Sequence, residues 1–327
     1  DRTLLGSAVT SSLAAQRGFT GLPYAGFPGS ASLAQALRPF PQFSSITNMK
    51  WVPTGKNWYD ALQIQGTKRF SHGLDFTSSF TWSRTFTMGT ESDISTLSVT
   101  TPPINDAFNR NTNKYLSGLD QPFLFVFAGN YTTPGKGNKW FSTLTKDWTL
   151  GTVLRYGAGF PILAPIATTN LNSILFRETG AVGTTGGTFF DRVPGQSFFT
   201  QDLNCRCFDP QKDFVLNPGA WTNPPGGTFS SSAAYYTDYR QQRRPNESMS
   251  LARNFRFGKE GKLNLQIRAE FSNVFNRTFL NSPTSTNALA AQTRSAAGLS
   301  TAGFGFINTG TVQSAPRNGT LVGRFTF

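Results

Sequence analysis

The last ten residues, Asn318-Gly-Thr-Leu-Val-Gly-Arg-Phe-Thr-Phe327, decide how the rest of the chain is interpreted. If this stretch is extended, one of its faces carries Leu321, Phe325 and Phe327. The opposite face carries Thr320, Arg324 and Thr326, with Val322 as its single apolar member. A strand that is apolar on one side, polar on the other and aromatic at its end is typical of a surface between lipid and water.

The composition favours β-structure at a membrane over a deep hydrophobic core. Only 38% of the 327 residues are apolar, although 31 of them are Phe. No run of about 18 apolar residues is present, so we expect no transmembrane helix, whereas a barrel strand needs only about nine to eleven alternating residues. The net charge of +13 first suggests nucleic acid, but the basic residues are scattered. We therefore expect anionic outer-membrane lipid and lipopolysaccharide as partners, and no nucleic acid.

Alternating apolar and polar residues predict seven long strands, and 74–86 shows the alternation most cleanly. The predicted strands span 57–70, 74–86, 121–132, 147–160, 246–257, 262–273 and 317–327. Their polar face is expected to line the lumen with Asp75, Arg155, Arg268 and Glu270. Arg84 and Arg253 fall on the apolar face. Arg84 lies near the outer end of its strand, where it suggests a lipopolysaccharide contact, and Arg253 implies a bulge, a snorkelling side chain or a register slip.

The connections alternate between short turns and long loops, as in outer-membrane barrels with short periplasmic turns and long extracellular loops. We predict an all-β, antiparallel transmembrane β-barrel in which residues 57–327 supply the strands and residues 1–56 form an irregular extracellular-loop segment. Bacterial single-chain barrels have an even number of strands. Seven strands therefore predict a partial barrel, the C-terminal part of a larger one, with two unpaired edges.

Several motifs resemble those of a known receptor family. The terminal strand, with Leu321, Phe325 and Phe327, looks like the signal that the barrel-assembly machinery recognises. The segment Leu263-Asn-Leu-Gln-Ile-Arg-Ala-Glu-Phe-Ser-Asn-Val-Phe-Asn276 resembles the penultimate strand of TonB-dependent receptors. Asn57-Trp-Tyr-Asp-Ala-Leu-Gln-Ile-Gln65 and Leu216-Asn-Pro-Gly-Ala-Trp221 are similar to the Oar-like branch, whose members carry a carboxypeptidase-regulatory-like domain.

This resemblance implies an outer-membrane receptor that takes up a nutrient, with about 22 strands around a plug. It also implies energy supplied by TonB through an N-terminal part that this sequence does not contain. No cofactor is implied. The resemblance identifies no substrate-binding residue, because the loops that select the substrate vary too much.

The largest predicted loop contains four aromatic residues that are candidates for ligand binding: Trp221, Tyr235, Tyr236 and Tyr239. We favour the simpler interpretation that they pack the loop onto the barrel rim. Ser71 and His72 lie in a tight turn without a third catalytic partner, so we predict that the chain is not an enzyme.

The spacing of Cys205 and Cys207 disfavours a disulfide, and we favour a structural or incidental pair over a strained, exposed bridge. With His72 as the single histidine, no metal site is predicted. The alternative to the receptor is a secreted β-rich adhesion or carbohydrate-binding protein, in which the aromatic faces would pack sheet on sheet.

Overall fold

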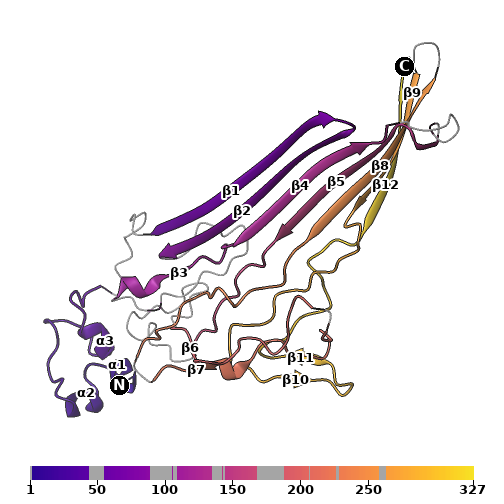
Figure 1. Cartoon of the computed structure of the whole chain (residues 1–327). Helices are drawn as coiled ribbons and strands as arrows, with labels where there is room; N and C mark the ends of the chain where they lie inside the picture. Colours follow the sequence, from indigo (N-terminus) through magenta and orange to yellow (C-terminus); the bar gives the residue numbers. More distant parts are fainter. Residues whose placement is uncertain are drawn as a thin grey trace.

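The computed structural model describes residues 2–43, 55–88, 105, 109–134, 142, 144–167, 188–205, 207–225, 228–257 and 263–327. Within these residues, one antiparallel sheet contains seven long strands (Figure 1). They are β1 (Lys56–Ser71), β2 (Leu74–Met88), β4 (Phe123–Thr132), β5 (Trp148–Gly157), β8 (Asn246–Phe257), β9 (Leu263–Ser272) and β12 (Asn318–Thr326). The seven predicted strands are confirmed, with ends that differ by at most three residues.

Each long strand pairs with the next one along the chain, in the order β1-β2-β4-β5-β8-β9-β12. The short β3 (Lys114–Leu116) adds to the far end of β2. In the described residues β1 pairs only with β2, and β12 only with β9, so the sheet is not closed into a barrel. The backbone groups on the outer sides of β1 and β12 are therefore available for pairing with further strands.

The turn between β1 and β2 is one of the short connections, which lie at one end of the sheet. Ser71 pairs with Leu74, so the loop has two residues, and both have positive φ: 56° at His72 and 81° at Gly73. Such a turn matches the twist of the strands that it joins. A Cβ at Gly73 would lie 2.2 Å from the Thr132 carbonyl oxygen, so only glycine fits there. The C-terminus lies at this same end (Figure 1).

Strand alternation gives the sheet an apolar face and a polar face. On the apolar face, Phe80 lies between Ile64 of β1 and Phe125 of β4. In the described residues these side chains have no second sheet or helix over them, and Ile64 and Trp82 are 57% and 60% exposed. A soluble sheet would bury this surface, whereas a membrane-embedded sheet leaves it for lipid.

The long connections pack together at the opposite end of the sheet and form a folded unit, which we call the loop cap (Figure 1). Its hydrophobic core includes Phe189, Phe190, Leu216, Tyr239, Phe304 and Ile307, all almost fully buried. Its short elements are η2 (Arg110–Asn113), β6 (Asp191–Arg192), η3 (Pro218–Ala220), β7 (Trp221–Thr222), β10 (Thr293–Arg294) and β11 (Ser300–Ala302). Buried apolar residues are thus concentrated in the cap and not along the strands.

The N-terminal segment contains three short helices, α1 (Arg2–Gly6), α2 (Ser12–Gln16) and α3 (Leu33–Ala36). The hydroxyl groups of Ser11 and Ser32 cap α2 and α3 by accepting hydrogen bonds from backbone N–H groups. A small core of Val9, Ala14, Phe27 and Leu33 holds the segment together. No helix in the described residues is long and apolar enough to span a membrane.

Candidate functional site: the polar face and the loop cap

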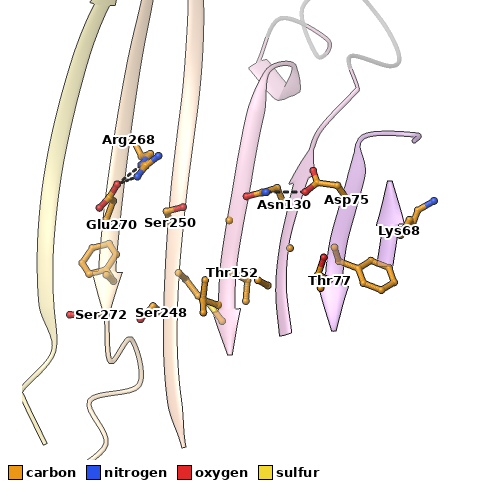
Figure 2. A pocket seen from close by; sticks show the side chains of 17 residues that line it. Lys68, Asp75, Thr77, Asn130, Thr152, Ser248, Ser250, Arg268, Glu270 and Ser272 are labelled. Carbon is orange, nitrogen blue, oxygen red and sulfur yellow. Dashed lines mark hydrogen bonds and ion pairs between the residues drawn. The ribbon is translucent and has the colours of Figure 1, made fainter. Parts of the chain in front are cut away.

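A transverse row of polar residues crosses the polar face of the sheet (Figure 2). Successive strand pairings align Asp75, Asn130, Gly151, Ser250, Glu270 and Thr320. The amide nitrogen of Asn130 donates a hydrogen bond to Asp75 Oδ2 at 3.1 Å, and Arg268 forms an ion pair with Glu270. An open groove of about 680 Å³ follows this row and includes Thr77, Ser248 and Ser272.

Gly151 makes room for the polar side chains at the centre of the row. A Cβ at this position would lie 2.6 Å from Ser250 Oγ and 3.1 Å from Asn130 Oδ1. Its neighbours on β4 and β8 therefore extend their polar groups over the glycine. The alternation of the sequence does not reveal this arrangement, which depends on the pairing of three strands.

The structure brings together three of the four predicted lumen-facing residues. Asp75, Arg268 and Glu270 line the groove, whereas Arg155 lies on the same face nearer the loop cap and outside the groove lining. All four residues lie on one face of the sheet, and the direction of that face toward a lumen stays a prediction. Whether these side chains contact a substrate or a plug stays a prediction.

The predicted aromatic ligand residues lie inside the loop cap. Trp221, Tyr235 and Tyr239 are buried and Tyr236 is half-buried. Trp221, Tyr236 and Tyr239 surround Phe198, which stacks on Trp221 with ring centroids 4.9 Å apart. Their packing into the cap agrees with the interpretation that the sequence favours. A role in ligand binding stays a prediction, and Tyr236 offers the most accessible ring of this group.

Tyr235 lies apart from the other three aromatic residues, next to Tyr115 and Gly118. Arg192, which no sequence pattern singles out, lies over Phe198 with its guanidinium carbon 4.2 Å from the ring centroid. Burial raises the pKa of the Tyr239 hydroxyl, so this group stays protonated in the cap.

A buried ion pair joins the loop cap to the strands. The Asp120 side chain is fully buried, and its carboxylate accepts hydrogen bonds from Arg240 Nη2 at 2.5 Å and from the Thr85 backbone N–H at 2.6 Å. Arg240 Nη1 also donates to the backbone oxygens of Asp120 and Gly159. Arg240 therefore connects the ends of β2, β4 and β5 to the longest loop, although 120 residues separate it from Asp120.

Comparison with known families agrees with this arrangement of an exposed apolar face, a polar face and a loop cap. The family model for an outer membrane beta barrel domain matches residues 13–319. The chain belongs to this family. It is therefore an outer-membrane protein whose apolar face contacts lipid and whose all-β sheet is barrel wall. No curated protein matches the chain. No solved structure matches it either.

The charged residues on the lipid-facing side of this outer-membrane barrel lie near the ends of the strands. Arg253 lies opposite Trp148, the first residue of β5, at the end with the short turns. Its guanidinium carbon is 5.2 Å from the centroid of the Trp148 ring and 4.9 Å from that of Phe255. The register of β8 is continuous, which excludes the bulge and the register slip and leaves Arg253 among interfacial aromatic rings.

Acidic residues lie next to two further arginines. Arg84 lies opposite Asp60 in the register of β1 and β2. Glu247 is fully buried at the start of β8, where both of its carboxylate oxygens accept hydrogen bonds from Arg277 Nε at 2.8 and 3.0 Å. No local pattern in the sequence relates Glu247 to Arg277, which lie 30 residues apart. The ion pair with Arg277 lowers the cost of burying the Glu247 charge.

The C-terminal residues Leu321, Phe325 and Phe327 are the predicted assembly signal. Leu321 lies opposite Ala269 and Phe325 opposite Leu265, both on the lipid-facing side. Leu321, Phe325 and Phe327 are exposed, and Phe327 is 93% exposed. A recognition partner would therefore find all three side chains accessible. Their recognition by the barrel-assembly machinery stays a prediction.

Ser71 and His72 contact each other in the turn between β1 and β2. His72 Nδ1 lies 2.8 Å from Ser71 Oγ inside the turn, and His72 has the positive φ that the turn requires. Cys205 and Cys207 form a disulfide with Cα atoms 5.3 Å apart, so the expectation that their spacing disfavours a bond is wrong. The loop allows the bond because its Cα separation falls within the normal range for disulfides. The described residues contain no group of three His, Cys, Asp or Glu side chains that could hold a metal ion.

Proposed function

We propose that this chain is the C-terminal barrel portion of an Oar-like TonB-dependent receptor that takes up a nutrient across the outer membrane. The groove on the polar face is the observation that carries the proposal. In a barrel of about eight strands, inward side chains fill the interior. Here seven strands leave an open groove of about 680 Å³ and two unpaired edges, which favours a wider barrel around a plug or a substrate path.

The loop cap also supports a receptor. Loops on the outer side of a barrel carry the contacts that select a ligand, and here they have a buried core that keeps them in place. We propose TonB, acting through an N-terminal part, and the barrel-assembly machinery as partners. Lipopolysaccharide is the proposed partner at Arg84. The proposal assigns no catalysis and no cofactor to this chain.

A secreted adhesion or carbohydrate-binding protein fits the structure less well. Its aromatic face would be covered by a second sheet, but no second sheet lies on the apolar face within the described residues. Family membership also places the chain in the outer membrane. We therefore do not retain this alternative.

The intact mass and N-terminal sequence of the native protein test the proposal. The protein is taken from a detergent-solubilised outer-membrane fraction. We expect a mass well above the 35.7 kDa of this chain, with a plug domain and a TonB-binding segment upstream. A native mass of 35.7 kDa in that fraction would contradict the receptor and leave a small outer-membrane protein of another kind.

A further inference from the structure

Two arginines lie side by side where the polar face meets the loop cap. Arg155 belongs to β5 and pairs with Asn246, the first residue of β8. The backbone N–H of Arg244 donates to the Gly157 carbonyl at 3.4 Å, which continues the same ladder by two residues. Arg155 and Arg244 therefore project from the same face as diagonal neighbours, about 7–8 Å apart at the backbone. Long side chains at this separation can reach a common ligand.

Neutral groups hold Arg244 in position. Its Nη2 donates to Gln241 Oε1 at 2.9 Å and to Gln313 Oε1 at 2.5 Å, and its guanidinium carbon lies 5.7 Å from the centroid of the Phe160 ring. Gln313 comes from the connection that leads into β12, so two long loops fix this guanidinium. Arg155 is exposed. The site is thus partly rigid and partly open to solvent.

The positive charge of this pair is not balanced by nearby acidic groups. No carboxylate of the described residues forms an ion pair with Arg155 or Arg244, while four arginines elsewhere do have acidic partners: Arg192, Arg240, Arg268 and Arg277. Burial and the charge of Arg155 lower the pKa of Arg244. Like charges placed side by side on one face of a sheet destabilise it. Such an arrangement is a common sign of a site that binds the opposite charge.

We infer that Arg155 and Arg244 form an anion-binding site, which takes a nutrient through a carboxylate or phosphate group. The guanidinium group presents a planar set of N–H donors that matches both of these anions. The pair lies where a molecule leaving the loop cap first meets the polar face. The role of this pair as a substrate site rests on the proposed receptor function. The binding chemistry itself depends only on the two arginines and the groups that hold them.

Calorimetric titration of the detergent-solubilised native protein tests the site, with inorganic phosphate and succinate as separate probes. We expect saturable binding of at least one probe, and the stronger of the two identifies the group that the nutrient carries. Arg155→Gln and Arg244→Gln should each weaken binding about ten- to hundredfold, because each removes hydrogen bonds from a charged donor. Arg256→Gln is the matched control, because Arg256 shares the polar face of β8 but lies at the opposite end, and binding should not change.

The Arg155→Gln variant is expected to fold like the native protein, because the Arg155 side chain is exposed and forms no ion pair in the described residues. A loss of binding in this variant therefore reports on the site and not on unfolding. Circular dichroism should show the same β-structure in this variant as in the native protein. Absence of binding by both probes, or equal binding by Arg155→Gln and the native protein, would overturn the inference. Neither outcome alters the intact mass on which the receptor proposal depends, so the two failures can be told apart.

Discussion

Ile64→Arg is expected to lower the free energy of unfolding in a lipid bilayer by about 2–4 kcal/mol, whereas Gln65→Arg should change it far less. Ile64 lies midway along β1 on the lipid-facing side, and Gln65 is the next residue, on the polar side. Both side chains are exposed, so neither substitution removes a packed core residue. The difference between the variants therefore reports the cost of placing one charge in lipid.

Denaturant unfolding of the native protein and both variants in bilayers of one lipid composition measures this difference. The midpoint of Ile64→Arg should shift strongly to lower denaturant concentration, and that of Gln65→Arg should remain close to the native value. Equal shifts for the two variants would mean that both faces of β1 meet the same environment. That result would contradict the assignment of the apolar face to lipid.

Asp120→Ala is expected to destabilise the junction between the strands and the loop cap by about 3–5 kcal/mol, because it leaves the Arg240 charge without its buried partner. It also removes the acceptor of the Thr85 N–H, which lies on β2. Asp238→Ala is the control, because its ion pair with Arg192 is exposed at both side chains. An exposed pair contributes only about 0–1 kcal/mol.

Hydrogen exchange of the native protein and both variants measures the free energy of opening of the cap. Amides near Arg240 and Gly159 should lose protection strongly in Asp120→Ala and only slightly in Asp238→Ala. The same loss in both variants would show that Asp120 does not anchor the cap.

Strands and their faces were predictable because alternation of apolar and polar residues is a local signal. Residues 74–86 alternate with only Ser78 and Arg84 as polar members of the apolar face, and β2 follows this segment with two further residues at its end. The position of Arg253 on the apolar face was also predictable. Its depth was not, because depth depends on the register that places it opposite Trp148. Local pattern thus identifies the face of a residue, and strand pairing determines its height in the membrane.

The loop cap was not predictable because its contacts join residues far apart in the sequence. No spacing rule relates Asp120 to Arg240, or Arg244 to Gln313, which lie 120 and 69 residues apart. The aromatic residues of the largest loop were recognised as candidates, but the packing of Trp221, Tyr236 and Tyr239 around Phe198 follows from how several loops meet. The disulfide between Cys205 and Cys207 likewise depends on the local path of the loop.

Nitroxide scanning along residues 79–84 of β2 tests most directly whether this chain forms the wall of a membrane barrel. Single cysteines are introduced into the native protein after Cys205 and Cys207 are replaced by serine, and the labels are measured in bilayers. We expect access to dissolved oxygen to peak at positions 80 and 82, and access to a water-soluble relaxation agent to peak at 79 and 81, because Ser83 is buried. Absence of this alternation, or the opposite phase, would contradict the lipid-facing assignment.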